Sequence, residues 1–175
     1  MIRRFEAFAP IIESGAWVDE MALVVGDVTL GPDSSVWPMS VVRGDVNFIR
    51  IGARTNIQDG SVLHVTHDNA HSPGGKPLIV GDDVTVGHKV TLHACTVGNR
   101  CLIGMGAIVL DGAEIPDETM VGAGSLVPPN KVLDGGYLWL GSPVRRVRAL
   151  TEPEKAYLKY SAEHYVRLKN RHAAG

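Results

Sequence analysis

The sequence predicts an all-β chain, a solenoid of short strands known as a β-helix, followed by one C-terminal α-helix. Apolar residues recur at every sixth position over most of the chain. The 175 residues include 20 glycines but only 6% aromatic residues, a composition that suits short strands joined by tight turns. From Thr151 onward the apolar spacing becomes helical. We therefore expect a β-helix domain over residues 1–150 and a packed helix within residues 151–175.

The six-residue repeat carries the fold prediction. Its lead positions are Val18, Val24, Leu30, Val36, Val42, Ile51, Ile57, Leu63, Val80, Val86, Leu92, Val97, Ile103, Val109, Ile115, Val121 and Val127. A hexad is too short for a helical repeat, and hexapeptide repeats are typical of β-helices. The alternative is a β-sandwich with an accidental period, but a sandwich shows alternating strands with turns every 8–12 residues or so.

A second position accompanies each lead residue. The residue four places on is usually small or β-branched, and we expect both positions to point inward. The fourth-place residues are Ala22, Val28, Ser34, Ser40, Val46, Thr55, Ser61, Val84, Val90, Thr96, Cys101, Ala107, Ala113, Thr119 and Ser125. The rhythm is expected to stop after Val127, because Pro128-Pro129 and Gly135-Gly136 predict a loop.

Residues 152–171 predict one amphipathic helix lying along the solenoid. Thr151 and Glu154 have the spacing of a capping box, with Pro153 in the first turn. The residues that recur at helical spacing are Leu158, Ala162, Tyr165 and Lys169. Plain capping and packing explain most of this helix.

Composition excludes several classes of function. The net charge of −2 gives no reason to expect a nucleic-acid partner. No apolar run approaches the roughly 20 residues that cross a bilayer, so no membrane partner is expected. Glu6 and Pro10 interrupt any N-terminal signal region. We expect a cytoplasmic protein in which Cys95 and Cys101 are free thiols.

The pattern [LIV]-G-x-x-[STAV]-x resembles the hexapeptide-repeat family. The resemblance implies a left-handed parallel β-helix in which three hexads form one triangular coil. Leu63 and Leu92 are three leads apart, so His64 and His93, which follow them, are expected to stack about 5 Å apart. Counting three leads back from Leu63 places Arg43 in the same column.

A second column lies on the neighbouring face. It contains Asp59 and His88, each two places after its lead residue. His88 therefore lies across an edge from the other two histidines and is poorly placed to join them within one chain. It could join the pair of a neighbouring subunit, which would give three shared sites around a threefold axis.

Three neutral imidazoles are a familiar ligand set for catalytic zinc, because the fourth position stays open for water. Zinc lowers the pKa of that water to about 7 and so generates hydroxide. A lone histidine is more simply a surface or packing residue, but the register of His64, His88 and His93 favours a metal site. The predicted metal is Zn²⁺, with Fe²⁺ or Co²⁺ as alternatives.

These motifs resemble the gamma-class carbonic anhydrase family, and in particular its small bacterial carbonic-anhydrase-like subgroup. The matching segments are Arg43-Gly44-Asp45, Asn56-Ile57-Gln58-Asp59-Gly60, His64, Gly87-His88 and His93. The resemblance runs from about residue 10 to the C-terminal helix. It implies a homotrimeric zinc lyase in which metal-bound hydroxide attacks CO₂ to give bicarbonate at sites shared between subunits.

The resemblance also implies roles for individual residues. His64, His88 and His93 would be the metal ligands, and Gln58 would orient the hydroxide or the substrate. Tyr165 matches a tyrosine that can approach the metal, although helix packing alone also explains it.

Four further residues would form a supporting network. Arg43 and Asp59 would pair across the subunit interface, and Asp45 and Asn56 would support them. The alternative is that these are turn residues of a β-helix, with the Arg–carboxylate pair serving structure alone.

One departure from the family concerns the insertion His67–Pro77, which lacks the glutamate that shuttles protons in the best-known members. His67 or His71 could take that role because imidazole titrates near neutral pH. Asp68 is less suited, since an aspartate pKa lies far below 7. The loop could instead simply cover the site.

Two other functions stay open. Many hexapeptide-repeat proteins are acyltransferases that use one histidine as general base, but no pantetheine or nucleotide feature is evident here. The missing glutamate leaves room for a metal-binding scaffold with weak esterase or thioesterase activity.

Overall fold

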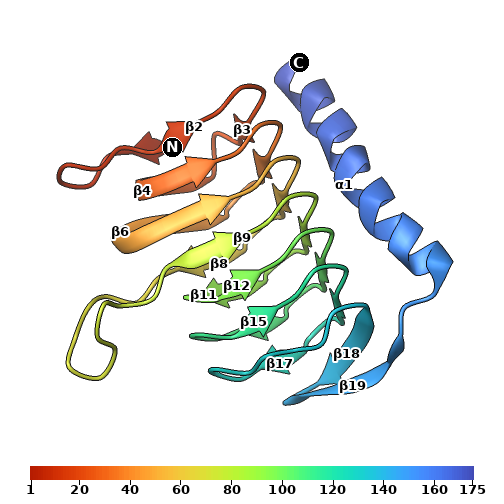
Figure 1. Cartoon of the computed structure of the whole chain (residues 1–175). Helices are drawn as coiled ribbons and strands as arrows, with labels where there is room; N and C mark the ends of the chain where they lie inside the picture. The colour runs from red at the N-terminus through yellow and green to blue at the C-terminus, as the bar shows by residue number, and fades with distance from the viewer.

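The computed structural model describes residues 1–175 and contains the predicted parallel β-helix with one C-terminal helix (Figure 1). The strands form an 11-stranded and an 8-stranded sheet. Their bounds are β1 Ile2–Arg3, β2 Ile11–Ile12, β3 Trp17–Val18, β4 Leu23–Leu30, β5 Ser35–Val36, β6 Val41–Ile51, β7 Asn56–Ile57, β8 Val62–His64, β9 Leu78–Val80, β10 Thr85–Val86, β11 Thr91–His93, β12 Thr96–Val97, β13 Leu102–Ile103, β14 Ile108–Val109, β15 Glu114–Ile115, β16 Met120–Val121, β17 Leu126–Val127, β18 Tyr137–Gly141 and β19 Val144–Ala149.

Strand register confirms that three hexads make one coil. In the parallel pair β8–β11, Leu63 lies opposite Leu92 and His64 lies opposite His93. In β7–β10, Ile57 lies opposite Val86. The lead residues therefore stack in columns along the solenoid axis.

The core follows the lead positions closely. All are buried except Val18, which is half-buried. The fourth-place prediction is wrong at Val46 and Thr96, which are both exposed. Each lies at an interruption of the repeat, where the residue two places before the next lead points inward instead. Ile49 and Cys95 hold those inward positions and are buried.

The repeat extends further than the sequence indicated. Ile12 lies opposite Leu30 in a parallel pair, one hexad before Val18. Leu133 and Trp139 lie one and two hexads after Val127, and both belong to the buried core. The expected loop therefore contributes a last coil, in which β18 pairs with β16 before β19 returns antiparallel.

Helix α1 spans Glu152–Ala173 and lies along one face of the β-helix (Figure 1). The predicted capping box between Thr151 and Glu154 is present. Near the other end, Lys169 is 2% exposed, and its Nζ lies 3.0 Å from Oδ1 of Asp33 on the solenoid. The helix is two residues longer than predicted and is fixed at that end by a buried cation.

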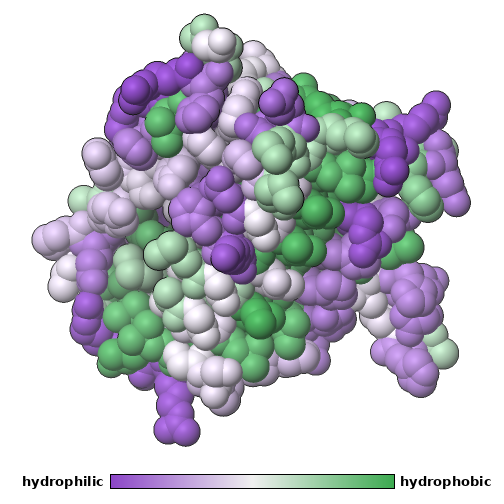
Figure 2. Space-filling model, turned by 180° about the vertical axis from the view of Figure 1, so that it is seen from behind, coloured by the Kyte–Doolittle hydropathy of each residue, from purple (hydrophilic) through white to green (hydrophobic).

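Several surface features bear on function. The segment between β8 and β9 projects from the solenoid as a long loop (Figure 1), whose base is a bridge between Thr66 and Lys76. Cys95 and Cys101 are free and buried. The helix of this chain is not apolar enough to span a bilayer. Figure 2 shows hydrophobic side chains gathered in patches between hydrophilic ones on the face opposite that of Figure 1.

Candidate metal centre

His64 and His93 face one another from adjacent coils. Strands β8 and β11 hold them in register, as the hexad count predicts. Nδ1 of His64 lies 3.1 Å from Nε2 of His93, and the ring centroids are 5.1 Å apart. The solenoid therefore directs two imidazole nitrogens at the same point.

Each of the three candidate histidines is held by an aspartate of its own. Nε2 of His64 lies 3.0 Å from Asp45. Nδ1 of His93 lies 2.9 Å from Asp111, and Nδ1 of His88 lies 2.8 Å from Asp59. A carboxylate on one ring nitrogen fixes the tautomer and leaves the other nitrogen as a lone-pair donor, an arrangement typical of metal-ligating histidines.

The donor set fits a divalent metal. Two imidazole nitrogens bound to one tetrahedral zinc, each at about 2.0–2.1 Å, are roughly 3.3 Å apart. The observed separation between His64 and His93 is 3.1 Å, close to that value. Burial lowers the pKa of His64, which outweighs the opposing effect of Asp45 and favours the neutral, ligating form.

Two of the supporting aspartates are held as carboxylates. Burial alone would raise the pKa of Asp45, but hydrogen bonds from Arg43 and His64 outweigh it and lower the pKa. Burial alone would likewise raise the pKa of Asp111, but hydrogen bonds from Thr66 and His93 outweigh burial and lower the pKa below its usual value. Both remain acceptors for the imidazole N–H at neutral pH.

His88 lies apart from this pair. It follows β10 at a turn, and its side chain is 43% exposed. No cluster of three His, Cys, Asp or Glu side chains with metal-binding geometry forms within the single chain. The structure thus brings together two of the three predicted ligands and leaves the third at the surface.

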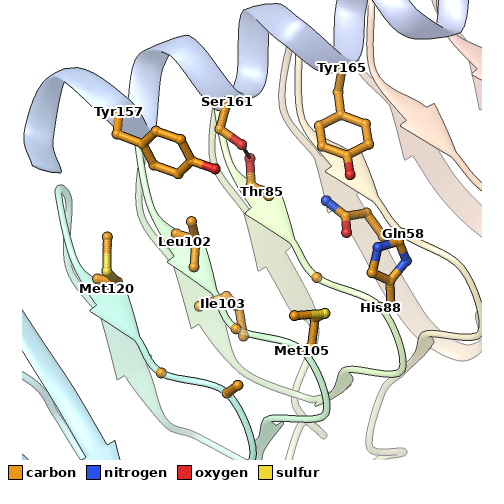
Figure 3. Close-up of a pocket in the computed structure, with 14 residues that line it drawn as sticks. Gln58, Thr85, His88, Leu102, Ile103, Met105, Met120, Tyr157, Ser161 and Tyr165 are labelled. Carbon is orange, nitrogen blue, oxygen red and sulfur yellow. Dashed lines mark hydrogen bonds between the residues drawn. The ribbon is translucent and has the colours of Figure 1, made fainter.

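A buried row of hydrogen bonds runs beneath helix α1. Nε2 of Gln58 donates to Oδ1 of Asn56 at 3.0 Å, and Nδ2 of Asn56 donates to Thr85 at 3.2 Å. The Thr85 hydroxyl lies 2.9 Å from that of Ser161 on the helix. Tyr165 points from the helix toward Gln58 (Figure 3), and burial, with a smaller contribution from the charge of Asp59, raises its pKa. The row fixes the orientation of the Gln58 amide beside His88.

No family model matches the chain. It is 55% identical over 170 residues to the protein YrdA of Escherichia coli, covering 97% of this chain and 92% of that one. It is 43% identical to the carbonic anhydrase of Geobacillus kaustophilus, covering 95% of this chain and 87% of that one. It is 46% identical to the mitochondrial gamma carbonic anhydrase 1 of Arabidopsis thaliana, covering 95% of this chain and 60% of that longer protein.

The chain belongs to the gamma carbonic anhydrase family. A solved hexapeptide transferase family protein from Anaplasma phagocytophilum shares its fold, with a TM-score of 0.89, 38% identity, and coverage of 97% of this chain and 96% of that one. That likeness confirms the hexapeptide-repeat fold class.

In this member of the gamma carbonic anhydrase family, Arg43 contacts a carboxylate of its own chain. Its Nη1 lies 2.6 Å from Oδ2 of Asp45, which also holds His64. Arg43 and Asp45 are therefore part of one hydrogen-bonded group with the imidazole. The expected contact of Arg43 with Asp59 of another subunit stays a prediction.

The projecting loop carries His67 and His71, and both are exposed. Asp68 accepts a hydrogen bond from the backbone N–H of Gly74 and so supports the loop itself. The structure places none of these three beside the histidine pair by a direct contact, and a role of His67 or His71 in proton transfer stays a prediction.

Sequence reasoning missed Asp111 and Thr66. The Thr66 hydroxyl donates to Oδ1 of Asp111, while the other oxygen of Asp111 holds His93. Asp111 lies two places after the lead residue Val109, as Asp59 and His88 do after theirs. Leu92 is in register with Val109, so one more coil past His93 reaches Leu110, and Asp111 lies one residue beyond that column.

Proposed function

We propose that this family member is a metal-dependent carbonic anhydrase that interconverts CO₂ and bicarbonate in a homotrimer. The observation that carries the proposal is the orientation of His64 and His93. Their free nitrogens converge at 3.1 Å while an aspartate occupies each remaining nitrogen. The identity to named carbonic anhydrases supports the same activity.

The third ligand would come from a second chain. His88 points outward from a turn, is backed by Asp59, and has one ring nitrogen without a partner in its own chain. A threefold arrangement would bring His88 of one subunit to the His64–His93 pair of the next, with Arg43 and Asp59 close to the contact. Zn²⁺ is the metal we propose, with Fe²⁺ or Co²⁺ as alternatives.

The bound metal would supply a nucleophile by lowering the pKa of a water to about 7. The protein's own residues would do the rest. Gln58, oriented by Asn56, can donate its second amide N–H to an oxygen of CO₂ or bicarbonate. Tyr165 would approach the same space from helix α1. Hydration consumes CO₂ and water and releases bicarbonate and a proton, which His67 or His71 could pass to solvent.

Elemental analysis, light scattering and stopped-flow CO₂ hydration test the proposal on one purified sample. We expect a trimer with about one divalent metal per chain and hydration faster than that of the free metal ion. A trimer without tightly bound metal would contradict the metal centre. A metal-loaded trimer that does not hydrate CO₂, even with imidazole buffer as proton acceptor, would favour the scaffold with weak esterase or thioesterase activity.

A second candidate is acyl transfer, favoured by the likeness to a hexapeptide transferase family protein. Such an enzyme would bind acetyl-CoA and use one histidine as general base. Calorimetric titration with acetyl-CoA separates the two: tight binding favours the transferase, and its absence leaves the anhydrase.

A further inference from the structure

Beneath helix α1, the positions that follow the lead residues change from large side chains to glycine part-way along the solenoid. In this row the residue that follows each lead is Trp37, then Gln58, then Gly87, Gly104 and Gly122. A Cβ at Gly104 would lie 2.4 Å from the backbone nitrogen of Ala123, so no side chain fits there. The three glycines therefore leave a hollow next to the polar row.

The hollow is a groove of about 450 Å³ between helix α1 and coils of the solenoid. Figure 3 shows Gln58, His88 and Tyr165 at one end and Tyr157 and Met120 toward the other. Leu102 lies between, on the wall facing the helix. One end of the groove thus offers polar groups, and the other offers apolar surface.

The groove is far larger than CO₂ or bicarbonate requires. Its volume lies in the range of about 300–1,000 Å³ that holds organic ligands. Among the 14 lining residues there is no Asp, Glu, Lys or Arg, and His88 is the only histidine. A charged group would therefore be stable only at the polar end, while the remaining length suits hydrocarbon.

We propose that this groove binds a monocarboxylate with an apolar tail. The carboxylate has the planar O–C–O group of bicarbonate and takes its place beside Gln58 and His88. The tail lies over the glycine floor toward Met120 and Tyr157. This inference rests on the proposed function, because the bicarbonate position defines where the carboxylate lies.

The test is isothermal titration calorimetry of the metal-loaded wild-type protein with acetate, butanoate, hexanoate and octanoate. Burying each added methylene should lower Kd about fourfold until the groove is full. Ala123 lines the apolar end and is exposed, so Ala123→Phe fills the groove without entering the core. We expect this variant to remove most of the gain between butanoate and octanoate.

Ala156→Phe is the matched control, since Ala156 is an exposed alanine on helix α1, which borders the groove, but it does not line the groove. It should keep the wild-type dependence on chain length. Equal Kd values along the wild-type series would overturn the proposal, and this outcome does not depend on whether the variants fold. Such equal values are expected if another copy of the chain fills the groove. CO₂ hydration by the wild type is measured in parallel. Chain-length dependence without hydration refutes the anhydrase and not the groove, and the reverse result refutes the groove alone.

Discussion

The two parts of the proposed metal centre differ in how much of their geometry one chain provides. His64 and His93 lie on paired strands, and His64 has an 18% exposed side chain. His88 lies at a turn on the next face, 43% exposed, with Asp59 as its partner. One chain by itself therefore builds a preorganised pair, whereas the proposed third ligand, His88, would reach a shared metal only when another subunit approaches.

The largest expected effect comes from removing a member of the pair. His93→Ala should lower metal affinity by at least about 100-fold, because even losing an outer hydrogen-bond partner of a ligand costs about 10–100-fold. His88→Ala should cost as much if a shared site exists. His164→Ala, an exposed helix position, is the control. Metal content after dialysis against a chelator measures the effect, and full metal retention by His88→Ala would rule out the shared site.

Mixing the two inactive variants sharpens the comparison. In a mixed trimer of His88→Ala and His93→Ala chains, one of three interfaces joins an intact pair to an intact His88. Co-expression at equal levels gives mixed trimers in about three quarters of the molecules, so hydration should return to about a quarter of the wild-type level. If all three ligands came from one chain, the mixture would stay inactive.

A smaller effect is expected from the support behind the pair. Asp111→Asn keeps the size of the side chain but weakens its acceptance of the His93 N–H, so metal affinity should fall by about 10–100-fold. Asp134→Asn is the matched control, because Asp134 is exposed and its carboxylate pairs only with Arg146. An unchanged affinity in Asp111→Asn would mean that His93 needs no such support.

The smallest expected effect is a pH dependence of stability in the metal-free protein. Because burial lowers the pKa of His64 below 6.5, the unfolded chain binds this proton more readily. Stability from this group is complete above pH 6.5 and declines as the pH falls, by at most about 1.4 kcal/mol per pH unit. Urea unfolding at fixed protein concentration should show a flatter profile for His64→Gln than for His164→Gln. Equal slopes would contradict the buried, neutral His64.

Much of the fold could be predicted from the hexad alone. Burial of the lead residues could be predicted from the six-residue period and the expectation that these positions point inward, and both are local properties of the chain. The predictions for Val46 and Thr96 were wrong because an insertion or a deletion shifts the six-residue period at these places. Only the next lead residue shows where the repeat resumes. The burial of Leu133 and Trp139 was not predicted, because the proline pair and the glycine pair near them predict a loop. The chain nevertheless stays in register with the repeat.

The site was predictable where residues share a column and not where they meet across a turn. His64, His93, and the pair Asp59–His88 follow from counting coils. The contact of Asp111 with Thr66 depends on how the projecting loop returns to the solenoid, which periodicity does not specify. The groove could not be predicted, because it forms where three glycines lie beneath α1. The sequence does not specify the path of the helix over the solenoid.

The last strand of the 8-stranded sheet, β19, runs antiparallel to β18 and lies at the edge of that sheet. An open final rung would present unpaired amides on which further chains could polymerise. Here the reversed direction is combined with exposed arginines at positions 145, 146 and 148. Charged side chains along an edge strand disfavour pairing with a strand of another molecule, so β19 protects this end of the solenoid from edge-to-edge association.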